Sequence, residues 1–119
     1  MARYVDGFVV PVPKKNVAAY RRMAQKSAKV WREHGALEYH ECLADDVKPG
    51  KHTSFPQSVK MKPDETVVFA YVVYASRAQR DRTMAKVMKD PRIAAMMTKP
   101  MPFDGKRMFF GGFKTIVSM

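Results

Sequence analysis

One amphipathic helix that runs directly into a strand, between Pro13 and Asp45, constrains the fold of this chain more than any other stretch. Apolar and small residues recur at helical spacing along one side of residues 17–31, and charged residues occupy the other side. Gly35 then stands where a left-handed residue ends a helix, and residues 37–43 alternate as a strand does. Such a helix has to lie on an apolar surface, so we expect it to cover a sheet made by the same chain. Its stripe consists of Val17, Tyr20, Ala24, Ser27, Ala28 and Trp31.

The rest of the chain predicts three more strands and a second helix. The strands are expected at residues 3–12, 66–75 and 106–117. A capping box of Ser76 and Gln79 predicts a helix over 77–89, and Asp90-Pro91 restarts a short helical turn that ends near Met97. The order is βαββαβ, a ferredoxin-like pattern of the α+β class with two helices on one face of a four-stranded antiparallel sheet. We expect one domain over residues 1–119 and a long polar connection at 51–64.

The composition indicates a cytoplasmic protein. Cys42 is the one cysteine, which excludes an internal disulfide and fits a reducing compartment. The chain begins without a hydrophobic signal region, and its longest apolar run, residues 67–75, is too short to cross a bilayer. We therefore expect no membrane partner.

The charge balance is strongly basic, with 22 Lys and Arg residues against 11 Asp and Glu residues, a net charge of +11. A surface of this kind attracts RNA and other polyanions, although net charge alone favours a solvated exterior over a specific partner. If the helices bind nucleic acid, the basic residues of the long helix are the candidates. They are Arg22, Lys26 and Lys29.

The sheet face that the helices leave uncovered is expected to be strongly aromatic. Alternation along the first strand places Tyr4, Asp6 and Phe8 on one face, and we assign that face, with Phe69 and Tyr71 of the third strand, to the open side. This much aromatic area needs a cover. One prediction is a homodimer in which two open faces enclose a small-molecule cavity lined by Tyr4, Phe8, Phe69, Tyr71 and Phe103.

The alternative is RNA that stacks on the open face, as in the RNA-recognition motif, which has the same element order. The run from Phe69 to Tyr74 resembles the aromatic half of that motif's third-strand signature. Val67 and Val68 stand where the signature requires a basic residue and a glycine. The match therefore mostly reflects the aromatic and β-branched alternation that any buried strand shows.

Long runs of this sequence resemble the YbaA-like family, a bacterial family catalogued as domain of unknown function 1428. The resemblance covers almost the whole chain and implies a dimeric α+β barrel, a fold shared with small antibiotic-biosynthesis monooxygenases and related isomerases. It implies no known reaction. The runs that carry it are residues 4–13, 30–37, 41–42 with 45–46, 76–77 with 80–81, 101–104, 106–108 and 111–113.

Three residues are candidates for catalysis. Asp6 is expected among aromatic side chains, where burial raises the pKa of a carboxyl toward the range of a general base, and Arg107 on the last strand is its expected partner as an ion pair or an anion-binding group. His34 ends the long helix, where the helix dipole favours its protonated form. The sequence leaves open whether the protein is an enzyme, and only fold analogy points to cofactor-independent monooxygenase or isomerase chemistry.

We predict no metal site and no cofactor. His40 and Cys42 share one face of the second strand, but the sequence supplies no second cysteine and no spacing that brings further ligands to them.

Overall fold

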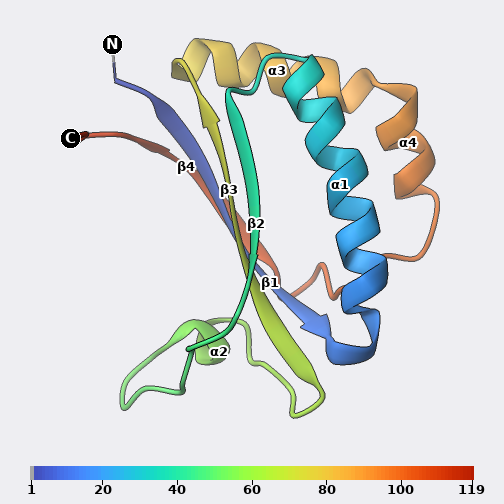
Figure 1. The fold of residues 1–119 in the computed structure, drawn as a ribbon, viewed down its shortest axis with the longest axis vertical. Coiled ribbons are helices and arrows are strands. Elements are labelled where there is room, and N and C mark those ends of the chain that lie inside the picture. The colour runs from blue at the N-terminus through green and yellow to red at the C-terminus, as the bar shows by residue number, and fades with distance from the viewer. Residues whose placement is uncertain (1) are drawn as a thin grey trace.

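The structure is a computed structural model that describes residues 2–119, and it has the predicted order of elements (Figure 1). The long helix and the strand that follows it are α1 and β2, and the last strand, β4, is shorter than expected because residues 104–107 form a turn. The elements are β1 (Tyr4–Pro13), a 3₁₀ turn (Lys14–Asn16), α1 (Val17–Glu33), β2 (Glu38–Leu43), α2 (Phe55–Ser58), β3 (Glu65–Tyr74), α3 (Arg77–Lys89), α4 (Pro91–Met97) and β4 (Phe109–Lys114).

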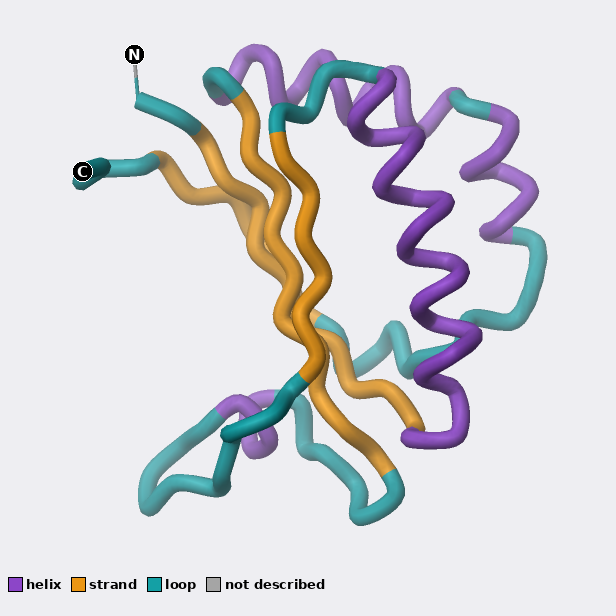
Figure 2. The backbone as a smooth tube through the Cα atoms, viewed as in Figure 1, coloured by secondary structure: helices purple, strands orange, loops and turns teal. Residues whose placement is uncertain are grey.

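The strands form one antiparallel sheet in the order β2-β3-β1-β4, and α1, α3 and α4 lie on one side of it (Figure 2). The helix boundaries follow the expected signals. Ser76 accepts a hydrogen bond from the Gln79 amide at 3.1 Å, and Asp90 accepts one from the Arg92 amide at 2.9 Å. Gly35 has a φ of 124°. None of the described helices is long and apolar enough to cross a membrane.

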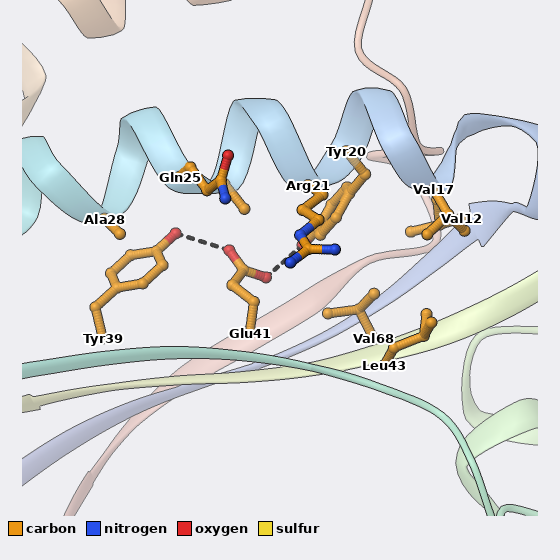
Figure 3. A pocket seen from close by; sticks show the side chains of 11 residues that line it. Val12, Val17, Tyr20, Arg21, Gln25, Ala28, Tyr39, Glu41, Leu43 and Val68 are labelled. Carbon is orange, nitrogen blue, oxygen red and sulfur yellow. Dashed lines mark hydrogen bonds between the residues drawn. The ribbon is translucent and has the colours of Figure 1, made fainter.

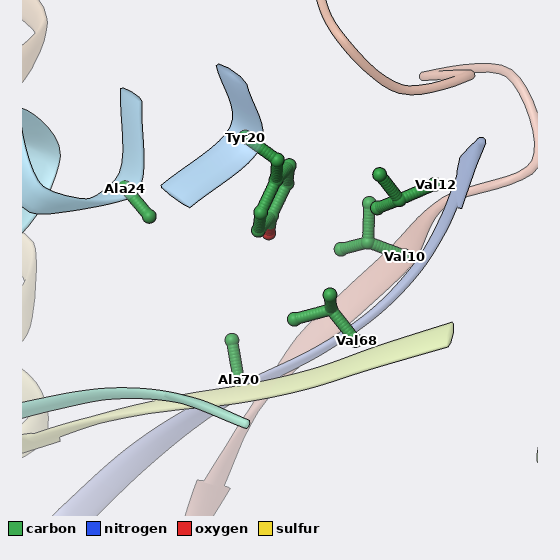
Figure 4. Close-up of a cluster of buried hydrophobic side chains, with 6 residues drawn as sticks. All are labelled: Val10, Val12, Tyr20, Ala24, Val68 and Ala70. Carbon is green, nitrogen blue, oxygen red and sulfur yellow. The ribbon is translucent and has the colours of Figure 1, made fainter. Parts of the chain in front are cut away.

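The buried core shows which face of β1 meets the helices. Val10 and Val12 of β1 pack with two neighbouring β3 residues against Tyr20 and Ala24 of α1 (Figure 4). Residues at even positions of β1 and β3 therefore face the helices, and those at odd positions face away. The cluster consists of Val10, Val12, Tyr20, Ala24, Val68 and Ala70.

The assignment of Tyr4, Asp6 and Phe8 to the open face was wrong. These residues alternate with Val10 and Val12, so they point toward the helices. Both sets of alternate residues on β1 are largely apolar, so the period of two could separate the sets but could not decide which of them the helices cover. For β3 the assignment was right, since Phe69 and Tyr71 lie opposite Val9 and Gly7 on the face without α1, α3 and α4.

The connection at 51–64 covers one end of that second face. It contains the short helix α2, which Ser54 begins by accepting a hydrogen bond from the Gln57 amide. The following residue Val59 is fully buried with Val9 and Val67. On the rest of this face no described helix covers the sheet (Figure 1), and Phe109 and Phe113 of β4 are exposed there.

Arg107 holds this connection to the last turn of the chain. Its guanidinium donates to Glu65 at 2.5 Å and to Asp104 at 2.8 Å, and also to the carbonyl oxygens of Val59 and Lys60. Glu65 is only 4% exposed, and hydrogen bonding from Arg107 lowers the pKa of its carboxyl. One arginine thus joins the start of β3, the segment before it and the turn before β4.

We expect Arg107→Ala to lower the free energy of unfolding by about 3–5 kcal/mol, because the buried Glu65 carboxylate loses its charged partner and keeps only the hydrogen bond from the Lys62 amide. Urea denaturation followed by circular dichroism measures this loss. Arg3→Ala is the matched control, since the Arg3–Glu38 pair is exposed and should contribute less than about 1 kcal/mol. Equal losses in the two variants would contradict the structural role of Arg107.

Candidate functional site

The predicted catalytic residues do not form one site. Asp6 is 5% exposed and accepts hydrogen bonds from Arg80 Nε at 3.1 and 3.2 Å. The expected Asp6–Arg107 pair was wrong. Arg107 binds Glu65, which lies opposite Pro13, seven residues along β1 from Asp6 and so roughly 20 Å away. The sequence alone could not place Arg80 or Arg107 relative to Asp6, because both arginines are remote from Asp6 in the chain.

His34 is also engaged elsewhere. Its Nε2 lies 2.8 Å from Asp90 Oδ2, so it joins the end of α1 to the beginning of α4. Hydrogen bonds from Arg92 and then His34 lower the pKa of Asp90. The catalytic roles of Asp6, His34 and Arg107 stay predictions, but among residues 2–119 no hydrogen bond or ion pair joins any two of the three.

The predicted cavity-lining aromatics divide between the two faces of the sheet. Phe8 and Phe103 lie on the helix side and line a small chamber there. Tyr4 is on the same side, with the Arg80 guanidinium 5.1 Å from its ring centre. Phe69 and Tyr71 lie on the other side, where Tyr71 also contacts His40 at a ring distance of 4.8 Å. The predicted lining residues therefore do not surround a single cavity within one chain.

A cavity of about 420 Å³ opens between α1 and the β2 side of the sheet (Figure 3). Apolar side chains from both layers form most of its wall. Glu41 rises from β2 into the middle of this wall, and Arg21 and Gln25 reach it from α1. The other lining residues are Val12, Val17, Tyr20, Ala24, Ala28, Tyr39, Leu43 and Val68.

Two tyrosines hold the Glu41 carboxylate. The Tyr20 hydroxyl donates to Oε1 at 2.6 Å, and the Tyr39 hydroxyl donates to Oε2 at 2.7 Å (Figure 3). Burial, reinforced by the Glu41 charge, raises the pKa of both phenols. At neutral pH both hydroxyls are therefore protonated donors, and the carboxylate is fixed from the helix and from its own strand.

A second, inner chamber of about 130 Å³ adjoins the same three residues. Tyr20, Tyr39 and Glu41 line both spaces, so the hydrogen-bonded group borders the outer cavity on one side and the chamber on the other. The chamber is otherwise apolar, and the buried indole N–H of Trp31, which also lines it, has no hydrogen-bond partner among residues 2–119. Its remaining lining residues are Phe8, Val10, Met23, Ala70, Val72, Phe103 and Met108.

The sequence contained a signal for this site that we did not use. Tyr39, Glu41 and Leu43 alternate on β2, so one charged side chain stands between two large ones on the face that meets α1. We considered Glu41 only beside His40 and Cys42, and those two residues point to the opposite face. Within the described chain, no group of three or more metal-ligating side chains comes together.

The basic residues proposed for nucleic acid lie on the outside of α1. Arg22, Lys26 and Lys29 are all exposed, and the first two line a shallow groove with Lys99 beside the segment that follows α4. This groove is separate from the 420 Å³ cavity that Glu41 lines, which we call the Glu41 cavity, since the two share no lining residue.

Comparisons with known proteins match almost the whole chain to proteins described as uncharacterized or of unknown function. The model of a family described as "Protein of unknown function (DUF1428)" matches residues 3–105. The uncharacterized protein YbaA of Escherichia coli (strain K12) is 49% identical over 115 residues, which cover 97% of each chain.

Solved structures confirm the predicted ferredoxin-like fold. A dimeric ferredoxin-like protein from an uncultured marine organism superposes with a TM-score of 0.64 at 11% identity and covers 100% of both chains. A nipsnap family protein with unknown function from Agrobacterium tumefaciens superposes with a TM-score of 0.62 at 11% identity, over 95% of this chain and 87% of the other. At these identities the likeness establishes the fold alone.

The geometry predicts that Tyr39→Phe costs about 1.5–3 kcal/mol of folding stability, because it removes a hydrogen bond to a charged group. In a Glu41→Leu background the same change should be nearly neutral, which makes the coupling energy at least about 1 kcal/mol. Denaturant unfolding of the four proteins in this cycle measures it. Tyr71→Phe, on the opposite sheet face, serves as the control and should show no coupling; additive effects of Tyr39 and Glu41 would contradict the assignment.

Proposed function

The chain belongs to the DUF1428 family, and on that premise we propose that it is a homodimer that binds a small organic molecule in the cavity between α1 and the sheet. The observation that carries the proposal is the Glu41 carboxylate, fixed by two phenol hydroxyls in the wall of a mainly apolar cavity. Ligand sites typically have volumes of about 300–1,000 Å³, apolar walls and a few well-placed polar groups. The Glu41 cavity has each of these features.

The same arrangement suits proton transfer. A carboxylate that a ligand can reach is a candidate general base, and the protonated hydroxyls of Tyr20 and Tyr39 are candidate donors beside it. The cofactor-independent monooxygenase or isomerase chemistry that fold analogy suggests would then use Glu41 in place of Asp6. Asp6 is bound by Arg80 and lines neither the outer cavity nor the inner chamber.

The open part of the second sheet face supports the homodimer. Phe69, Phe109 and Phe113 share this face and are 43%, 47% and 65% exposed. Several large apolar side chains exposed on one face of a folded domain indicate a contact with a partner. The similar structure from the marine organism is described as dimeric, which supports a second copy of this chain as that partner.

Nucleic-acid binding is the alternative from a different class. The groove beside Arg22, Lys26 and Lys99 and the exposed aromatic residues of the open face favour it. Experiment can distinguish RNA binding in the groove beside α1 from RNA binding on the open sheet face. A dimer through the open face would leave only the groove accessible to RNA.

We expect a fragment screen by thermal shift to find small molecules that raise the melting temperature of the wild-type protein by several degrees, since a ligand that binds only the folded state stabilises it. Ala28→Trp should remove these shifts, because the indole would fill the cavity that Ala28 lines. Ala18→Trp on the exposed side of the same helix is the matched control and should keep them. Hits that survive Ala28→Trp would place the ligand elsewhere and overturn the proposal.

For the dimer, light scattering during size-exclusion chromatography should give twice the 13.6 kDa chain mass. Phe113→Asp should shift the protein toward the monomer, because it buries a charge in the interface. Met97→Asp replaces an equally exposed apolar residue on α4 and should leave the mass unchanged. A wild-type monomer that binds single-stranded RNA with steep salt dependence would instead support the nucleic-acid alternative.

A further inference from the structure

We infer that the molecule bound beside Glu41 is an organic amine, held as its ammonium ion with its apolar part against the apolar wall of the cavity. This inference rests on the proposed function and specifies the chemical class of the ligand. It follows from three features of the site: the missing counter-charge, the free acceptor positions on the carboxylate, and the rings around it.

Glu41 differs in its partners from the other carboxylates that are withdrawn from solvent. Each of the other partly or fully buried ones has an arginine within 3.3 Å, and Glu41 has no cation within ion-pair distance among residues 2–119. The chain carries 22 lysines and arginines, so cations are not scarce. A partly buried carboxylate is stabilised by a nearby positive charge, and here that charge is left for an occupant. The paired carboxylates are Asp6, Glu65, Asp90 and Asp104.

The carboxylate also has room for more donors. Two carboxylate oxygens accept about four hydrogen bonds, and Tyr20 and Tyr39 supply one each. An ammonium group has three N–H donors, so it can fill the open positions while the two hydroxyls stay in place. A neutral hydroxyl would fill one position and leave the negative charge uncompensated.

The surroundings favour a cation with an apolar body. The rings of Tyr20 and Tyr39 flank the carboxylate, and Phe103 packs edge-on against Tyr20 at a centroid distance of 5.8 Å. Aromatic faces attract ammonium groups, and the apolar walls of the cavity and inner chamber accept an aliphatic or aromatic body. Arg21 lines the same cavity but lies beyond ion-pair distance of Glu41, and its charge disfavours a second positive charge on the ligand, so we expect a monoamine.

Titration calorimetry near neutral pH with three matched compounds tests the inference. They are 2-phenylethylamine, 2-phenylethanol and phenylacetate, which carry an ammonium, a hydroxyl and a carboxylate on a similar aromatic body. A second pair, hexylamine and 1-hexanol, repeats the comparison of amine with alcohol on an aliphatic body. We expect each amine to bind about tenfold more tightly than its alcohol, because a hydrogen bond between charged groups is stronger than a neutral one by roughly that factor. Phenylacetate should bind most weakly.

Two variants connect the preference to the carboxylate. Glu41→Gln should reduce the advantage of the amines over the alcohols to within about threefold, since the amide keeps the shape and loses the charge. Glu33→Gln removes a carboxylate on the exposed end of α1 and should leave the advantage unchanged.

Alcohols or phenylacetate that bind as tightly as the amines would overturn the inference, and so would an amine preference that persists in Glu41→Gln. If none of these compounds binds while fragments from the screen still bind in an Ala28-dependent manner, the amine is wrong and the proposed function stands. If no fragment depends on Ala28, both fail.

Discussion

The packing of Tyr20 between α1 and the sheet connects the fold of this protein to its candidate site. The ring is 7% exposed and lies in the core cluster with Val10 and Val12. Its hydroxyl donates a hydrogen bond of 2.6 Å to the Glu41 carboxylate on β2. The apolar stripe that makes residues 17–33 a sheet-covering helix therefore also sets the distance between the helix and the carboxylate. A change that lets α1 shift on the sheet would therefore alter both the cavity and the hydrogen bond between Tyr20 and Glu41.

Ion pairs, most of them made by arginine, join several of the other elements to one another. Asp6–Arg80 joins β1 to α3, Glu65–Arg107 joins the start of β3 to the turn before β4, and Asp90 receives both Arg92 and the helix-terminal His34. The Asp6–Arg80, Glu65–Arg107 and His34–Asp90 pairs join residues that are 74, 42 and 56 positions apart in the chain. Arg92, in contrast, is only two residues from Asp90. Since a broken buried pair costs far more than an exposed one, these contacts fix the arrangement of elements strongly. Several arginines therefore stabilise the fold through these pairs. Net charge alone is thus a weaker argument for a polyanion partner.

The sequence was sufficient for the four strands, for α1 and α3 and for their order, because local signals such as Gly35, Ser76 and Asp90-Pro91 bound these elements. It did not predict α2 within the connection at 51–64. It was insufficient for the faces of β1, where both alternating sets are apolar and only contact with α1 distinguishes them. It was also insufficient for the partner of Asp6, because choosing Arg80 over Arg107 requires the position of α3 relative to the sheet.

Glu41 was predictable in principle and missed in practice, because its neighbours in sequence, His40 and Cys42, are not its neighbours in space. This alternation along β2 has a functional consequence. Tyr39 and Glu41 serve the cavity under α1, while His40 faces the open side and packs on Tyr71. Ligand binding and dimer formation would therefore use opposite faces of one strand. A second copy on the open face would not occlude the cavity, yet any movement of β2 caused by a ligand at Glu41 would be transmitted directly to the dimer surface.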